Sequence, residues 1–298
     1  MTTAPRRLFA ATALLLAATL PATATAQAPF PSRAVKIVVG FPPGQAVDTV
    51  ARMIGQKFTE STGQPFVVDN KPGAAGMIGA EFVTKAAPDG HTLFMASSGP
   101  LAINPALYGS KIKYDSLKDF SHITVTASVP LFLVAHPNFP ANNAKELIAY
   151  AKANPGKVNY GSGGSGVTGH LAMEMFKSSA GIDMLHVPFK GGPPALSALI
   201  AGDVQVMFET GPGALPHVKA GRLKALAVGS LKRSAAAPDL PTVSESALPG
   251  FDAVAWNSIS APAGTPAPVI AKLHAEFVRI LAMPEIRERM LVLGMEPV

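Results

Sequence analysis

The sequence contains no cysteine among its 298 residues. Disulfide bonds, thiolate metal sites and thiol catalysis are therefore excluded. The 7 histidines form no H-E-x-x-H or similar metal-binding spacing. A G-x-S-x-G nucleophile motif is also absent, because Val167 stands where its last glycine is required. We therefore expect no metal, no cofactor and no catalytic residues, and these absences favour a binding protein over an enzyme.

Charged residues are also scarce, at 15% of the chain. The formal net charge is +6, and subtracting the arginines at positions 6 and 7 leaves +4 for the rest. No tract of lysine or arginine is present, so we expect no nucleic-acid partner. A mild positive surplus instead favours the approach of an anion.

The N-terminus has the three parts of a secretory signal peptide. The arginine pair at residues 6–7 precedes an uncharged apolar run over 8–20, and Ala-Thr-Ala follows at 24–26. This order predicts a signal peptide over residues 1–26 and a periplasmic location. A membrane-spanning helix needs about 20 apolar residues, and this run is shorter. The arginine pair leaves the Sec and twin-arginine routes both open.

The rest of the chain alternates short apolar strands with segments of helical pattern. This rhythm predicts an α/β fold with mostly parallel sheets flanked by helices. Such sheets bind ligands beyond the carboxyl ends of their strands, so the strand-to-helix loops are where a site is expected. The predicted strands are 35–39, 66–68, 92–95, 123–135, 157–160, 184–187, 204–208 and 222–228, and the predicted helices are 46–58, 77–87, 145–153, 168–179 and 194–201.

The first such loop, residues 40–48, is rich in glycine and proline and opens a helix. Free backbone N–H groups at a helix start favour an anion. Asp48 either caps that helix or contacts the ligand, and both roles are open. The candidate ligand-binding residues of this loop are Phe41, Gly44, Gln45, Ala46 and Asp48.

The second loop, residues 161–170, contains three glycines at the spacing of a dinucleotide-binding fingerprint. The acid that should end the next strand is missing, and the predicted export of the protein argues against NAD as a ligand. We therefore interpret the loop as a second anion site and His170, behind it, as a structural residue. Its candidate ligand-binding residues are Ser162, Gly163, Ser165 and Thr168.

Three shorter loops offer further polar groups after predicted strands. Ser97 and Ser98 provide hydroxyl donors. Lys190 beside Gly191 either supplies positive charge to a carboxylate or is an ordinary surface lysine. Glu209 either accepts from an amine or hydroxyl of the ligand or caps the next helix.

Several motifs occur together over the chain from about Pro31 to its last residue. They are GFPPG (40–44) with Asp48, DNKPG (69–73), APDGHTL (87–93), INP (103–105), VPFKGG (187–192), GDVQVMF (202–208) and APAGTP (261–266). Together they resemble the substrate-binding proteins of tripartite tricarboxylate transporters, the Bug family.

This resemblance implies a two-lobed periplasmic binding protein, type II-like, that acts as a monomer and closes on a small carboxylate. The carboxylate classes are a di- or tricarboxylate, an acidic amino acid or an aromatic acid. Connectivity assigns lobe 1 to residues 27–126 plus 230–298 and lobe 2 to 127–229. The segments 123–135 and 222–228 are then the two hinge crossovers. The partners implied are membrane transporter subunits or a membrane sensor.

Two positions depart from the family pattern. Gln45 stands where relatives often have glycine, so the ligand or the way it is held differs. The chain ends at Val298, where relatives usually continue with a further helical segment. An exported hydrolase or isomerase on a similar scaffold is the alternative function, and turnover of the bound compound distinguishes it from a receptor.

Overall fold

The computed structural model describes residues 30–298, so the predicted signal peptide lies outside the described residues. Its strands form one ten-stranded mixed sheet in the order β2-β1-β3-β9-β4-β7-β5-β6, with β8 and β10 also paired to β4. The strands are β1 (Val35–Val39), β2 (Phe66–Asn70), β3 (Thr92–Ser97), β4 (Phe120–Ala135), β5 (Asn159–Ser162), β6 (Leu185–Pro188), β7 (Val206–Thr210), β8 (Lys224–Val228), β9 (Val254–Pro262) and β10 (Glu296–Pro297).

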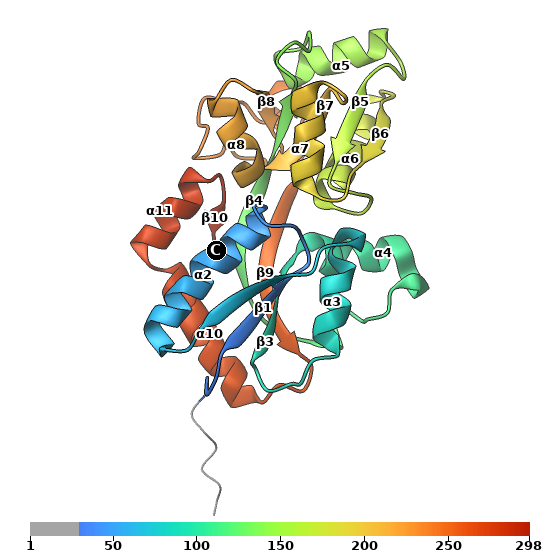
Figure 1. The fold of residues 1–298 in the computed structure, drawn as a ribbon. Helices are drawn as coiled ribbons and strands as arrows, with labels where there is room; N and C mark the ends of the chain where they lie inside the picture. The colour runs from blue at the N-terminus through green and yellow to red at the C-terminus, as the bar shows by residue number, and fades with distance from the viewer. Residues whose placement is uncertain (1–29) are drawn as a thin grey trace, which may run out of the picture.

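Helices cover both parts of this sheet (Figure 1). The longer ones are α2 (Ala46–Thr62), α3 (Met77–Thr84), α5 (Ala144–Ala153), α6 (Thr168–Ala180), α7 (Gly192–Ala201), α8 (Gly211–Lys219), α10 (Ala267–Leu281) and α11 (Pro284–Val292). The shorter ones are η2 (Ala74–Gly76), η3 (Gly99–Ile103), α4 (Asn104–Tyr108), η4 (Gly109–Lys111) and α9 (Val243–Ser246). In the described part of the chain, no helix has both the length and the apolar character needed to cross a membrane.

The long strand β4 divides the sheet into two halves. Its residues 120–130 pair with β9, whereas residues 131–135 pair with β7 and β8. We call β2, β1, β3, β9, β10 and the first part of β4 the first sheet, and the second part of β4 with β7, β5, β6 and β8 the second sheet. Figure 1 shows β4 running from one sheet into the other. The predicted crossover at 123–135 therefore falls within β4.

The predicted α/β fold is confirmed, with a difference at its centre. The outer strands of each sheet are parallel, as β1 is to β2 and β3, and β5 is to β6 and β7. The strands that pair with β4 are antiparallel to it. The segment predicted as the second crossover, 222–228, forms β8 and stays in the second sheet, and the chain enters the first sheet through β9.

Helix α2 shows how local sequence sets the position of a loop. Its apolar residues Val47, Val50, Ile54 and Phe58 recur every three or four positions and are buried. The helix ends at Gly63, whose φ of 69° is the left-handed conformation that glycine adopts without strain. Burial of this stripe places the helix along the first sheet, with its N-terminus at the carboxyl end of β1.

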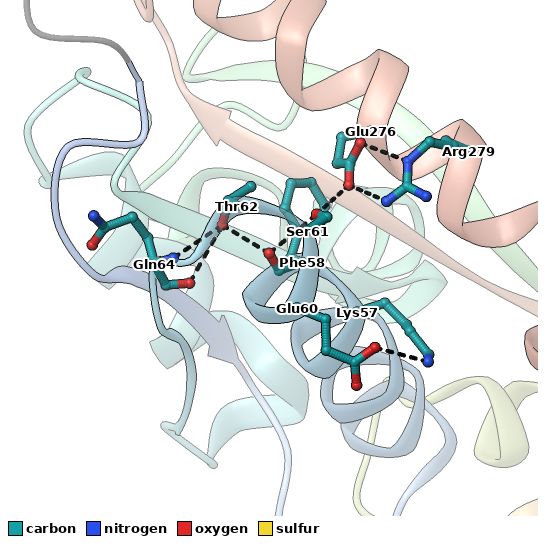
Figure 2. Close-up of polar contacts among 8 residues, drawn as sticks. All are labelled: Lys57, Phe58, Glu60, Ser61, Thr62, Gln64, Glu276 and Arg279. Atoms are coloured by element: carbon teal, nitrogen blue, oxygen red, sulfur yellow. Dashed lines mark hydrogen bonds and ion pairs between the residues drawn. The ribbon is translucent and has the colours of Figure 1, made fainter.

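The other end of α2 is fastened to α10. The ring of Phe58 lies 4.5 Å from that of Phe277, edge to face. Figure 2 shows the polar contacts beside it: Ser61 donates to Glu276, and Arg279 Nε donates to Glu276 Oε2 at 2.9 Å. These contacts fix the C-terminal end of α2 against α10. The N-terminus of α2, at the opposite end, lies between the two sheets.

Candidate ligand-binding cleft

A cavity lies between the two sheets, beside the strand-to-helix loops. It encloses about 590 Å³ of empty space, counting the open solvent at its mouth. Its lining comes from both halves of the molecule: Phe41, Gln45, Ala46, Val47, Ser97, Val129, Leu131, Gly163, Val167, Thr168, Gly169, Phe208, Glu209, Thr210, Ala255 and Asn257. Of the predicted site residues, the structure brings Phe41, Gln45, Ala46, Ser97, Gly163, Thr168 and Glu209 to this cavity.

Two helices begin at the cavity from opposite sheets. Ala46 and Val47 open α2, and Thr168 and Gly169 open α6; all four residues line the cavity. Neither helix has a side-chain cap at its N-terminus. The first N–H groups of a helix have no partner inside the helix, and the helix dipole makes this end favourable for negative charge. The cavity is therefore suited to an anion such as a carboxylate.

Asp48 does not line the cavity, because its carboxylate is used to hold the first loop. It is buried, and it accepts hydrogen bonds from Gly44 N at 3.0 Å, Arg52 Nε at 3.0 Å and Asn70 Nδ2 at 2.9 Å. Burial alone raises the pKa of Asp48, but these hydrogen bonds outweigh it and hold the pKa below the ordinary value. Asp48 and Gly44 thus fix the backbone of the first loop.

Ser162 and His170 lie behind the second loop. Ser162 is buried and is not among the lining residues, and its Oγ lies 2.6 Å from His186 Nε2. The ring of His186 stacks on His170 at 4.2 Å, and Gly166 N donates to His170 Nδ1 at 3.3 Å. Burial, then the neighbouring His170, lowers the pKa of His186 to about 4. Burial likewise lowers the pKa of His170, so both rings are neutral near pH 7.

Ser98, Ser165 and Gly191 do not line the cavity, and each takes part in a contact between the two halves of the molecule. Ser98 Oγ lies 2.7 Å from Thr168 Oγ1, and Tyr108 OH donates to the carbonyl of Ser165 at 3.2 Å. Gly191 packs against Pro42 so closely that a Cβ at Gly191 would lie 2.7 Å from the proline ring. The two sheets are therefore in contact at the mouth of the cavity, in a closed arrangement.

Lys190 is not brought to this cavity. It is exposed, and with Gly191 it borders an adjacent hollow, which shares Phe41 and Gly163 with the cavity. Its side chain is therefore not part of the lining described above.

The lining residues that the sequence did not predict are mostly on strands: Val129, Leu131, Phe208, Ala255 and Asn257, with Val47, Val167, Gly169 and Thr210 beside predicted positions. Asn257 is the one with the strongest polar character. It is 2% exposed, and its Nδ2 is buried without a hydrogen-bond partner among the described residues. Its position in the central strand β9, opposite Ser97 of β3, places it in the floor of the cavity. The sequence feature that could have identified this lining residue is an asparagine inside an apolar strand.

Residues 50–298 match the family model described as the tripartite tricarboxylate transporter family receptor. The chain belongs to this family. The resemblance predicted from the ordered motifs is therefore confirmed.

Individual members of the receptor family agree with this assignment. Protein BugT of Bordetella pertussis is 35% identical over 98% of this chain and 90% of its own length. Rpa4515 of R. palustris, solved with adipate, superposes with a TM-score of 0.88 at 34% identity, covering 90% of this receptor and 89% of that chain. MatC (Rpa3494) of Rhodopseudomonas palustris, solved with bound malate, gives a TM-score of 0.84 at 35% identity, covering 90% and 91%. These likenesses confirm the predicted two-lobed binding-protein fold of the receptor.

Proposed function

We propose that this receptor captures one small carboxylate in the cavity between its two sheets and delivers it for uptake without chemical change. The observation that carries the proposal is the meeting of two uncapped helix N-termini, those of α2 and α6, at one cavity. Charge-assisted hydrogen bonds from such N–H groups are stronger than neutral ones. Relatives solved with adipate and malate support a carboxylate as the ligand class.

The lobes that enclose the ligand are proposed as residues 27–126 plus 230–298 and residues 127–229. Strand β4 supports this division, because it passes from one sheet into the other. Hinge closure would bring the loops of both lobes around the ligand and exclude water, which strengthens each polar contact.

The setting of this function is the periplasm, reached through the signal peptide at residues 1–26. The receptor acts as a monomer and passes its ligand to membrane transporter subunits or reports its closed state to a sensor. The low charge of the chain and its lack of basic tracts support a small-molecule partner over a nucleic acid.

Ala46→Pro tests the helix N-terminus directly. Ala46 is the first residue of α2 and its preceding residue, Gln45, is extended with ψ 163°, so proline is compatible with the backbone there. The change removes one N–H donor at the cavity. We expect about tenfold weaker binding of a carboxylate identified by calorimetric screening of succinate, malate, citrate, glutamate and benzoate.

Ala144→Pro is the matched control, since Ala144 is the first residue of α5 and does not line the cavity. Equal affinity of the two variants would contradict the proposed role of α2. Incubation of the bound compound followed by mass spectrometry separates receptor from enzyme: recovery of unchanged ligand supports the proposal, and conversion to a product contradicts it.

A further inference from the structure

Glu209 is the ionisable side chain of the cavity. It is 7% exposed, and no lysine, arginine or histidine is found among the described residues that line the cavity with it. The cavity of this receptor thus combines helix N-termini, which favour an anion, with a buried carboxylate, which disfavours a second one.

The carboxylate of Glu209 is held by one of its oxygens. Oε1 accepts from the N–H of Thr210 at 2.7 Å and from its hydroxyl at 2.8 Å. Among the hydrogen bonds made by residues 30–298, none reaches Oε2. Gly192 leaves room for this oxygen, since a Cβ there would lie 2.8 Å from Oε2 and would collide with Gln45 Nε2.

Gln45 and Glu209 therefore approach the same glycine from opposite sheets. The amide of Gln45 is a donor, but it is neutral and leaves the charge of Glu209 uncompensated. Burying a carboxylate without a cation is costly, and burial accordingly raises the pKa of Glu209. A cation that entered with the ligand would relieve this cost.

Asn257 offers the complementary group on the first sheet. Its Nδ2 is a buried donor without a partner among the described residues, in a lining position next to Ser97. An unmet donor suits an acceptor such as a ligand carboxylate oxygen. A donor without a partner thus lies in the cavity wall on one sheet, and an acceptor lies on the other.

We propose that Glu209 accepts a hydrogen bond from a protonated amine of the ligand while Asn257 donates to its carboxylate, so that the receptor selects amino carboxylates over the matching carboxylates without an amine. This inference rests on the proposed function, because it assigns a ligand class to the same cavity.

Ligands that differ in one substituent, hydrogen, hydroxyl or amine, test the inference on the unaltered receptor. Three series are titrated by calorimetry: succinate, L-malate and L-aspartate; glutarate, L-2-hydroxyglutarate and L-glutamate; propanoate, L-lactate and L-alanine. In the series that binds most tightly, we expect the amine to bind about 10- to 100-fold more tightly than its unsubstituted match. The hydroxyl compound should fall between them, since it donates without charge.

Glu209→Gln keeps the shape and removes the charge. We expect it to reduce that preference to within about threefold, because a neutral amide gives an ammonium no charge-assisted bond. Asn257→Leu is the control inside the cavity and should weaken all three members alike, about 3- to 10-fold, with the preference kept. Glu60→Gln, an exposed position on α2, should change neither quantity.

The outcomes separate the inference from the function on which it rests. If the unsubstituted acid binds as tightly as the amine or more tightly, or if Glu209→Gln keeps the preference, the inference is overturned while carboxylate capture stands. The same holds if no member of any series binds but citrate or benzoate does. If none of these carboxylates binds the unaltered receptor, the proposed function fails as well.

Discussion

Two loops flank the cavity, residues 40–48 and 161–170. They have similar positions, but different kinds of interaction hold them in place. The first is held by an ionised carboxylate, Asp48, with Arg52 and Asn70 as donors. The second is held by neutral groups, the hydroxyl of Ser162 and the stacked rings of His186 and His170. Each arrangement directs an uncapped helix N-terminus toward the cavity. The loop before α2 is thus held by charged groups, and the loop before α6 is held by neutral ones.

The difference predicts that the two loops lose stability in different pH ranges as the pH falls. The folded-state pKa of Asp48 is depressed, so its contribution to stability is present above the unfolded value of 3.8 and is lost only below it. The folded-state pKa of His186 is depressed from 6.5 to about 4. In that interval the unfolded chain binds a proton that the folded chain excludes, so stability falls as the pH falls. Mild acid should therefore weaken the second loop and spare the first.

The largest effect is expected from Asp48→Ala, which removes the acceptor at the centre of the first loop. Gly44 N and Asn70 Nδ2 lose a partner, while Arg52 is half exposed and regains water. We expect the free energy of unfolding in urea to fall by about 2–3 kcal/mol. Asp203→Ala, an exposed acid, is the control and should be neutral. A loss no greater than that of the control would show that the first loop does not depend on Asp48.

The next effect is the response of the second loop to acid. Between pH 6.5 and pH 4.5 we expect the free energy of unfolding to fall by about 1 kcal/mol through His186, after allowance for its partial exposure. Urea titrations across this range measure the slope. His186→Gln should flatten it, whereas His274→Gln, at an exposed position on α10, should leave it unchanged. An unaltered slope in His186→Gln would remove the contrast between the loops.

The smallest effect concerns the contact between Ser98, which follows β3, and Thr168 of the second loop. Ser98→Ala removes the hydroxyl 2.7 Å from Thr168 Oγ1, and one neutral hydrogen bond in the closed state is at stake. We expect carboxylate affinity to fall about 3- to 10-fold with little change in melting temperature. Lys190→Ala, whose side chain borders another hollow, should change affinity less than twofold. A larger effect of Lys190→Ala than of Ser98→Ala would contradict this placement of the two residues.

Much of the cavity could be predicted because it is built from local segments. The alternation of strand and helix placed the loops at 40–48 and 161–170, and these segments supply Phe41, Gln45, Gly163 and Thr168 to the lining. A glycine-rich turn that opens a helix depends on a few adjacent residues. It can therefore be predicted from the sequence without knowledge of the tertiary structure.

Other parts of the lining could not be predicted from local pattern. Asn257 and Leu131 reach the cavity because their strands pair in a particular register, and register depends on partners far away in the sequence. Strand β9 was not predicted, nor were α8, α10 and α11. Helix α8 has Pro216 inside it, which obscures its pattern.

What the sequence determined by itself is therefore the family, the α/β class and the loops able to bind an anion, because each follows from ordered motifs or from short-range periodicity. What only the tertiary structure decided is the use of each side chain. Asp48 and Ser162 face their own loops, Ser98 meets Thr168 across the cleft, and Glu209 shares the cavity with Asn257. These roles depend on which groups are buried together, and burial is a property of the packed chain rather than of any segment within it.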